Sequence, residues 1–203
     1  MNKKCDFCDR NELGERIIAE DDYFYIVATF GQISDGGYVI IIPKTHIPCM
    51  GQLKKPELYN IAPLLNRVSG AITAEYGYAP LIFEHGIIGQ SIKHAHIHLV
   101  PTKCSLTLRI YRDFPNSKIN GVREWRELVN MYSAHPEPYL LWREYSSEIM
   151  SICHNPPAPA QYLRVILAEI AGRPERANWR NMDQELDKRL CTETVLRLKT
   201  YFK

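Results

Sequence analysis

HAHIHLVP, residues 94–101, places three of the chain's seven histidines at alternate positions within five residues. Successive side chains of a β-strand point to opposite faces, so this spacing puts His94, His96 and His98 on one face and apolar residues on the other. Imidazole titrates nearest to neutral pH, and it serves as a metal ligand, a nucleophile or a proton carrier. The stretch therefore predicts a strand whose polar face carries chemistry.

The whole chain limits the function classes that need to be considered. Its 203 residues can hold one large domain or a smaller domain with an extension, and 45% hydrophobic residues argue against disorder. A net charge of +2 supplies no strong field for nucleic acid or an anionic membrane, so neither is an expected partner. The charged N-terminal stretch lacks the apolar core of a signal peptide, and no apolar run is long enough to span a membrane. We therefore expect a cytoplasmic protein.

Apolar periodicity predicts strands that alternate with helices along the chain. The expected strands are two within 16–30 around the turn Asp21-Asp22, and others at 36–44, 80–86, 94–101, 138–145 and 148–153. The expected helices are 54–77, 122–133, 161–172 and 182–202. Short connections favour antiparallel pairing, so the fold class is α+β, with an antiparallel sheet and flanking helices.

The strand pattern fades between residues 102 and 114, which suggests a boundary there. We predict a first domain at 1–104 with a metal-binding N-terminal segment. A mixed α/β extension at 105–203, mainly helical with one hairpin, is expected to pack on the sheet of the first domain. Its helix 161–172 carries an apolar stripe that would not stay in water alone.

The His-x-His spacing also occurs at metal sites of other folds. Cupin-like barrels place a glutamate a few residues downstream, and HLVPTKC (98–104) contains none. A metal-dependent amidohydrolase barrel needs about 250 residues, which is more than this chain offers.

Two stretches carry a resemblance to a known family. GQSIKHAHIHLVP (89–101) closely resembles the signature of the histidine triad (HIT) superfamily, His-φ-His-φ-His-φ-φ with φ apolar, preceded by Gly-Gln-Ser or Gly-Gln-Thr. GGYVIIIPKTH (36–46) is similar to the family's Gly-His-x-φ-φ-φ-Pro-Lys-x-His strand, with Tyr38 where a histidine usually stands. The resemblance covers about residues 5–102 and implies the HIT fold.

The resemblance implies a reaction and its residues. HIT proteins are nucleotide hydrolases and transferases in which the middle histidine attacks the α-phosphorus, so His96 would form a covalent nucleotidyl-histidine. His98 would hydrogen-bond a phosphate oxygen or the departing group. The loop residues Gly89, Gln90 and Ser91 would cradle phosphate oxygens.

Cys5 and Cys8 form a Cys-x-x-Cys pair, which alone could be a redox pair, half of a zinc site or two unrelated thiols. Many bacterial HIT proteins carry this pair and bind structural zinc with two histidines. By that resemblance, His46 and His94 would complete a tetrahedral Cys₂His₂ site for Zn²⁺. His94 would then tie the catalytic strand to the N-terminus.

The chain departs from the better-known branches at two places. Phe30 stands where nucleotide-selective members hold the ribose with an acid, and Asp35 lies in a different register. Glu84 stands where those branches have Asn or Gln; it could bind a substrate hydroxyl or amine, or position His85, or be part of a surface loop. The Glu-His-Gly loop and the extension both resemble a less characterised bacterial branch.

A Gln-x-x-Arg helix similar to Gln161–Arg164 occurs in HIT relatives connected with splicing factors. By this resemblance Arg164 could reach the substrate phosphate, or it could buttress the sheet. We therefore expect a zinc-containing HIT hydrolase or transferase for a nucleotide or nucleotide conjugate. The alternative is a non-catalytic nucleotide-binding or adaptor protein, and the sequence leaves open whether the chain forms the family's homodimer.

Overall fold

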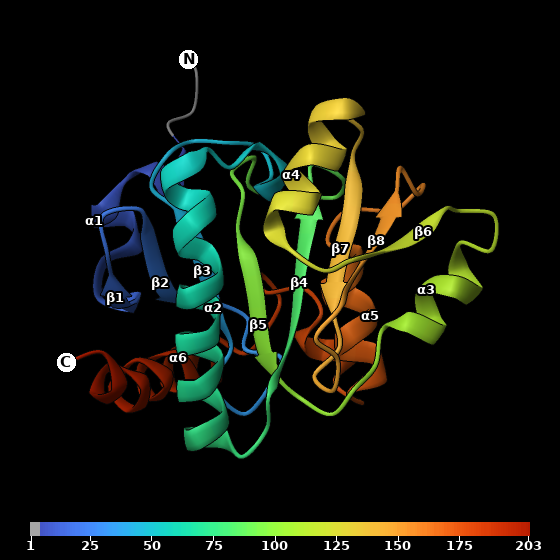
Figure 1. Ribbon diagram of the computed structural model, residues 1–203. Coiled ribbons are helices and arrows are strands. Elements are labelled where there is room, and N and C mark those ends of the chain that lie inside the picture. The colour runs from blue at the N-terminus through green and yellow to red at the C-terminus, as the bar shows by residue number, and fades with distance from the viewer. Residues whose placement is uncertain (1–4) are drawn as a thin grey trace.

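One antiparallel sheet of eight strands organises the molecule, as the computed structural model of residues 5–203 shows (Figure 1). The first four residues of the predicted 1–104 domain lie outside the described residues. The strand order is β1-β2-β3-β5-β4-β7-β8-β6, which confirms the α+β class. The strands are β1 Ile17–Glu20, β2 Phe24–Ala28, β3 Val39–Pro43, β4 Pro80–Gly86, β5 Ile97–Pro101, β6 Ile119–Val122, β7 Tyr139–Arg143 and β8 Met150–His154.

Six α-helices flank this sheet within the described residues. They are α1 Arg10–Leu13, α2 Lys55–Tyr76, α3 Thr107–Asp113, α4 Trp125–Ala134, α5 Tyr162–Ile170 and α6 Gln184–Leu198. The longest, α2, begins with Pro56 in its first turn and ends at Gly77, whose left-handed conformation closes the helix. Among residues 5–203, no helix combines the length and apolar character that crossing a membrane requires.

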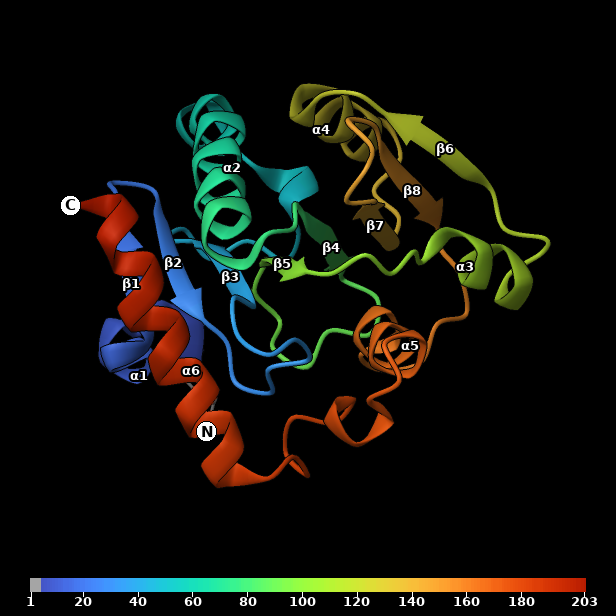
Figure 2. The ribbon, with the colours of Figure 1, turned by 90° about the horizontal axis from the view of Figure 1, so that it is seen from below.

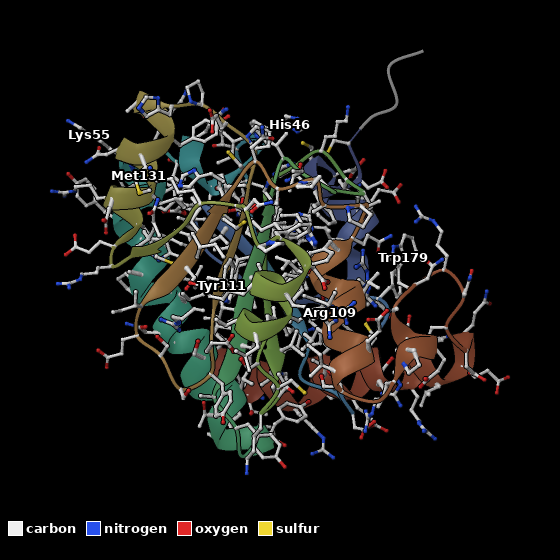
Figure 3. The ribbon with its side chains drawn as sticks, turned by 90° about the vertical axis from the view of Figure 1, so that its right-hand side faces the viewer. His46, Lys55, Arg109, Tyr111, Met131 and Trp179 are labelled. Atoms are coloured by element: carbon white, nitrogen blue, oxygen red, sulfur yellow. The ribbon has the colours of Figure 1, made fainter. Side chains whose placement is uncertain are left out.

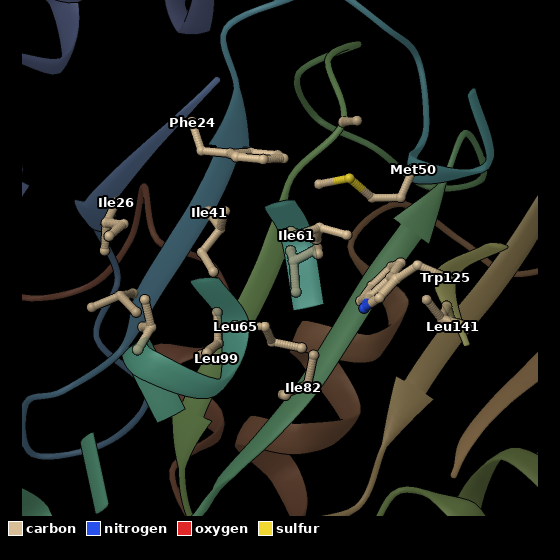
Figure 4. Packing of buried hydrophobic residues seen from close by; sticks show 14 of the residues in the cluster. Phe24, Ile26, Ile41, Met50, Ile61, Leu65, Ile82, Leu99, Trp125 and Leu141 are labelled. Carbon is tan, nitrogen blue, oxygen red and sulfur yellow. The ribbon is translucent and has the colours of Figure 1, made fainter. Parts of the chain in front are cut away.

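Helices cover both faces of the sheet (Figure 2). The alternation of side chains along each strand separates two cores, and Val39 and Ile41 of β3 belong to one while Ile40 and Ile42 belong to the other. The first core lies against α2 and α4, and Figure 4 shows Ile61 and Leu65 of α2 beside the strand residues Ile41, Ile82 and Leu99. The second core lies against α5, and it contains Leu163, Ile166 and Leu167.

The predicted strand 94–101 is shorter than expected. β5 begins at Ile97, and the preceding residues His94 to His96 lie outside the strand, with His94 in a bend. The reason is that the backbone N–H of Ala95 donates to the carbonyl of Ile47, in the connection after β3, instead of continuing the strand pairing. His94 is thereby turned toward the N-terminal segment, while His98 stays within the sheet.

The extension continues the same sheet. β7 pairs with β4 from Ile82↔Arg143 to Gly86↔Tyr139, and β8 and β6 follow outward. The expectation that the extension packs on the first sheet is therefore confirmed. The extension both pairs its strand β7 with the edge of β4 and packs α5 on one face of the sheet. α3 and β6 were not predicted, and α3 occupies part of the stretch in which the strand pattern fades.

Candidate active site

A cavity of about 230 Å³ lies on the α5 face of the sheet. His96 and His98 of the alternating histidine stretch line it. Residues from the N-terminal segment, from strands β3 and β4, from the loops after β2 and β4, and from the extension complete it: Asp6, Phe7, Glu12, Arg16, Thr29, Phe30, Ile40, His85, Gly89, Gln90, Ser91, Ile92, Gln161, Arg164 and Trp179. The cavity thus draws on both parts of the chain.

His96 is held with one ring nitrogen engaged. Nδ1 donates to the carbonyl oxygen of His94 at 2.7 Å, which leaves the lone pair of Nε2 for another atom. The ring of Phe7 meets His96 edge-on with a centroid distance of 5.1 Å. Burial lowers the pKa of His96 to about 4, so its imidazole is neutral at pH 7. A neutral, oriented imidazole is a nitrogen nucleophile.

His98 is fixed by stacking and by one hydrogen bond. Its ring is parallel to that of Phe83 at a centroid distance of 4.3 Å, and its Nδ1 lies 2.7 Å from the hydroxyl oxygen of Tyr38. Nε2 is buried and has no hydrogen-bond partner within the described chain. Since unpaired buried polar atoms cost free energy, this atom is suited to a ligand in the cavity.

The loop between β4 and His94 brings the predicted Gly89, Gln90 and Ser91 to the cavity. Gly89 has φ of +72°, and a Cβ there would lie 2.7 Å from the carbonyl oxygen of Pro159. Its own carbonyl accepts from the N–H of Gln161, and the Gln90 amide donates to the carbonyl of Pro48. The extension therefore holds the loop in place from one side.

His85 is a cavity residue that the sequence analysis mentioned without giving it a role of its own. Its Nε2 accepts from the backbone N–H of Leu163 at 3.1 Å, so a neutral His85 carries its proton on Nδ1. Burial lowers the pKa of His85 to about 3, which keeps the ring neutral. The alternation of side chains along β4 could have indicated this placement, because it puts His85 on the same face of the strand as Phe83 and Leu81.

Glu84 is not brought to the cavity. It lies on the opposite face of β4, fully buried, where its carboxylate accepts from the N–H of Met50 at 2.7 Å and from the Tyr139 hydroxyl at 2.7 Å. Alternation along the strand explains the placement, because neighbours on a strand cannot both face one cavity. Burial raises the pKa of Glu84 to about 7.

Arg164 is the predicted extension residue that does line the cavity. It is buried on α5, and its guanidinium donates to the carbonyl oxygens of Gly31, Ala177 and Arg176 and to the Tyr38 hydroxyl. Gly31 has no room for a Cβ, which would collide with the Arg164 guanidinium and with Trp179. Arg164 therefore both braces the cavity wall and brings positive charge to it.

The cavity wall farther from the histidines is aromatic. Phe30, at the position where the resemblance implies a ribose-binding acid, is 44% exposed, and the Arg16 guanidinium lies 4.3 Å from its ring centroid. Trp179, labelled in Figure 3 on the segment that joins α5 to α6, also lines the wall. Asp35 is not among the lining residues, because it pairs with Arg173 and Arg176.

The four predicted metal ligands form one cluster. Cys5, Cys8, His46 and His94 present ligand atoms that all lie within 4.8 Å of one another. Nδ1 of His94 is 3.4 Å from the Sγ of Cys5 and 3.4 Å from the Sγ of Cys8. Nδ1 of His46 is 3.2 Å from the Sγ of Cys8. Sulfur and nitrogen ligands of a tetrahedral Zn²⁺ stand about 3.5 Å apart, so this cluster could hold the ion.

The surroundings of His94 fit a metal ligand. Nε2 donates to the carbonyl oxygen of Pro43 at 2.8 Å, which leaves the lone pair on Nδ1, the nitrogen that faces the sulfurs. The ring is fully buried and meets Phe7 edge-on. Because Phe7 also contacts His96, the cluster and the cavity share a wall.

Comparison with protein families gives one match, which covers slightly less than half of the chain. A family model described as HIT domain matches residues 10–104. The comparison with curated proteins found no match.

Several solved structures are similar to this chain. A hypothetical histidine triad nucleotide-binding protein from Sulfolobus tokodaii is 27% identical over 48% of this chain and 68% of its own, with a TM-score of 0.43. A Zn-bound histidine triad family protein from Mycobacterium smegmatis is 19% identical over 65% of this chain and 98% of its own, at 0.44. A DUF4931 family protein from Bacillus cereus is 13% identical over 92% of this chain and 99% of its own, at 0.49.

Proposed function

We propose that this chain, whose residues 10–104 match the HIT domain model, is a nucleotide hydrolase or nucleotidyl transferase. The substrate is a nucleotide conjugate whose α-phosphorus is attacked by His96. The observation that carries this proposal is the state of His96: a neutral, buried imidazole with Nδ1 bonded to backbone and Nε2 left for the substrate. Such a nitrogen needs no general base to become nucleophilic.

The reaction proceeds in two displacements. The Nε2 lone pair of His96 forms a bond to the α-phosphorus, while the bond from phosphorus to the leaving group breaks and its electron pair departs with that group. Water or another acceptor then attacks phosphorus, and the electron pair of the P–N bond returns to Nε2. Splitting one displacement into two lowers the barrier of each.

The rest of the cavity supplies groups that stabilise negative charge. Backbone N–H groups of the Gly89 loop, the Ser91 hydroxyl and the unpartnered Nε2 of His98 are donors for phosphate oxygens or the leaving group. The buried guanidinium of Arg164 adds a positive charge at the wall. All of these are proposed substrate-binding groups. Glu84 is not one of them, because its carboxylate accepts hydrogen bonds from Met50 and Tyr139 on the opposite face of the sheet.

We further propose that Cys5, Cys8, His46 and His94 hold a structural Zn²⁺ ion. When bound, the ion supplies a cross-link between the N-terminal segment and the strand that carries the reactive histidine. The segment in turn places the Phe7 ring against His96. The ion therefore shapes the cavity wall without contacting the substrate.

The test is a panel of nucleotidyl substrates offered to the wild type, to His96→Ala and to His135→Ala. His135 is exposed at the end of α4 and serves as the matched control. The wild type and the control should turn over a substrate, and mass spectrometry after a brief incubation should detect a nucleotidyl adduct on His96. His96→Ala should lose about 10⁴-fold or more in turnover while remaining folded, because no other group replaces the nucleophile.

Near-wild-type turnover by a folded His96→Ala protein would overturn the mechanism. Tight nucleotide binding without turnover or adduct would instead support the non-catalytic alternative.

A further inference from the structure

Three side chains from distant parts of the sequence form a buried chain of hydrogen bonds beside the cavity. Nη1 of Arg164 on α5 lies 3.3 Å from the Tyr38 hydroxyl, and that hydroxyl lies 2.7 Å from Nδ1 of His98. Tyr38 is fully buried, and Arg164 and His98 are 4% and 7% exposed. Neither Tyr38 nor Arg164 needs to touch the reacting phosphorus to influence the reaction.

The direction of these hydrogen bonds follows from what each group can do. A guanidinium has only donors, so the Tyr38 oxygen accepts from Arg164. The hydroxyl hydrogen must then find another acceptor, since an unpaired buried hydroxyl would cost free energy. The acceptor within reach is Nδ1 of His98, which therefore carries the lone pair. A neutral His98 must carry its proton on Nε2.

The guanidinium cannot easily turn away. Its other hydrogen bonds go to the carbonyl oxygens of Gly31, Ala177 and Arg176, which come from two separate segments. Gly31 leaves no space on that side, because even a Cβ would collide with the guanidinium. No carboxylate forms an ion pair with Arg164 within residues 5–203, so its charge acts on Tyr38 and on the cavity.

We propose that Arg164 and Tyr38 are positioning residues that hold His98 in the tautomer with its proton on Nε2, the unpartnered nitrogen at the cavity. The role assigned to that proton rests on the proposed function: it hydrogen-bonds the leaving atom as negative charge develops there. The leaving group must then present a lone pair to a neutral donor, as a phosphate or alcohol oxygen or an amine nitrogen does. With Tyr38 removed, His98 would be free to present a lone pair instead and repel that atom.

The tautomer itself can be measured without any substrate. Long-range ¹H–¹⁵N spectra of the full chain, loaded with zinc and labelled at histidine nitrogens, distinguish the protonated from the unprotonated ring nitrogen, and His98→Asn assigns the signal. The wild type should show His98 protonated at Nε2 only. A wild-type His98 protonated at Nδ1, or at both nitrogens at pH 7, would overturn the proposal without any variant.

Two variants test the positioning pair. Tyr38→Phe removes the hydroxyl and keeps the ring, while Arg164→Met keeps much of the side-chain volume and frees the hydroxyl to accept from His98. In both, the Nδ1-protonated form should appear, and Arg164→Lys should restore part of the wild-type signal. Arg173→Met is the matched control, because Arg173 pairs with the exposed Asp35 and should leave His98 unchanged. Unchanged His98 signals in both folded test variants would overturn the proposal.

Kinetics separate this inference from the proposed function. If the chain is active, Tyr38→Phe should lower kcat about 10-fold with little change in KM. An enforced wrong tautomer would lower kcat by roughly 10⁴-fold. The loss in Tyr38→Phe is smaller because His98 can still adopt both tautomers. The loss should grow as the leaving group becomes more basic. An equal loss for all leaving groups would contradict the role of the proton. The expected NMR result without any turnover would leave the positioning intact and reject the proposed function.

Discussion

At the scale of single residues, backbone groups decide the tautomers of three histidines in and beside the cavity. His94 donates to the carbonyl of Pro43, His96 donates to the carbonyl of His94, and His85 accepts from the N–H of Leu163. His98 differs, since its partner is the side chain of Tyr38 and, through it, Arg164. Substitutions can therefore change the state of His98 more readily than that of the other three.

Glu84 yields a prediction about pH and stability. Burial raises the pKa of its carboxyl from an ordinary 4.5 to about 7. Between these pH values the folded protein keeps a proton that the unfolded chain releases, so folding stability falls as pH rises through this window, by up to about 3 kcal/mol. Glu84→Gln should remove this contribution, because the amide does not titrate.

The measurement is urea unfolding of the wild type and Glu84→Gln at pH 5 and at pH 8. The loss of unfolding free energy from pH 5 to pH 8 should be smaller in the variant by about 2–3 kcal/mol. If the unfolding free energy changed with pH by the same amount in the wild type and in Glu84→Gln, the Glu84 carboxyl would have the same pKa in the folded and unfolded states.

The sequence predicted the triad and the metal ligands but could not have assigned the partners of these residues. Tyr38 was visible as a departure from the family pattern, whereas its contact with Arg164 joins residues 126 positions apart. The placement of Glu84 was within reach, since alternation along 80–86 puts it opposite His85. Whether Glu84 or His85 points to the cavity depends on which face of the sheet α5 packs against. That packing is tertiary structure, which the strand pattern does not determine.

At the scale of elements, the loop after β4 depends on a glycine. Gly89 has φ of +72°, and a Cβ would approach the carbonyl oxygen of Pro159 to 2.7 Å, whereas Gly172 has φ of +70° with nothing within 4 Å. Both positions strain an alanine backbone by about 1 kcal/mol, but Gly89→Ala adds a clash with the extension. We expect Gly89→Ala to cost about 2–3 kcal/mol of stability and most of the turnover.

Gly172→Ala is the matched control and should cost about 1 kcal/mol while leaving turnover unchanged. Thermal unfolding and the substrate panel measure both quantities. Equal destabilisation by the two alanines would mean that the loop moves freely away from the extension.

The N-terminal segment gives a prediction about the metal. Removing one thiolate by Cys5→Ser should lower zinc content well below one equivalent and reduce the melting temperature by about 5–10 °C, since a structural ion contributes directly to folding. Turnover should fall but persist, because Phe7 loses its fixed place against His96 while the nucleophile remains. Elemental analysis, calorimetry and the substrate assay report the three quantities.

Cys104→Ser is the control, because Cys104 stands outside the metal cluster. Protein that is purified without added metal, contains no zinc and melts at the same temperature with or without added zinc would contradict the structural role.

Elements with strong periodicity were predicted, and elements that depend on distant partners were not. The predicted helices α2, α4, α5 and α6 and the 138–153 hairpin carry apolar patterns of their own. α3 has no side-chain cap of its own, and the carboxylate of Glu144 accepts from the N–H groups of Leu106 and Thr107 at its start. β6 is four residues long, contains Asn120-Gly121, and exists through its pairing with β8.

At the scale of the whole molecule, residues 105–203 contribute to the sheet, the second core and the cavity at once. β7 covers the β4 edge, Leu163 and Leu167 of α5 complete the core behind the histidines, and Arg164 and Gln161 reach the cavity and its loop. Asp187 of α6 accepts from the N–H groups of Gly31 and Gln32 and so holds the loop after β2. We propose that the predicted parts 1–104 and 105–203 fold as one unit.

Truncation after Thr102 tests that proposal. The fragment would expose the β4 edge, whose unpaired N–H and C=O groups invite intermolecular pairing, together with the apolar face that α5 covers. It should be insoluble, or soluble without a cooperative thermal transition, and it should lack turnover because the Gly89 loop loses its contact with Gln161. Calorimetry, near-ultraviolet circular dichroism and the substrate panel measure these outcomes.

Co-expression of residues 1–104 with 105–203 separates packing from chain continuity. The break falls in the irregular segment between β5 and α3, so it interrupts no helix or strand. If the two parts bury each other's apolar surfaces as the sheet implies, they should purify as a complex that binds zinc and recovers turnover, while either part alone fails to fold. A fragment 1–102 that folds cooperatively by itself with unchanged activity would show instead that the extension is a separate module, and the cavity residues Arg164 and Trp179 would then be dispensable for the reaction.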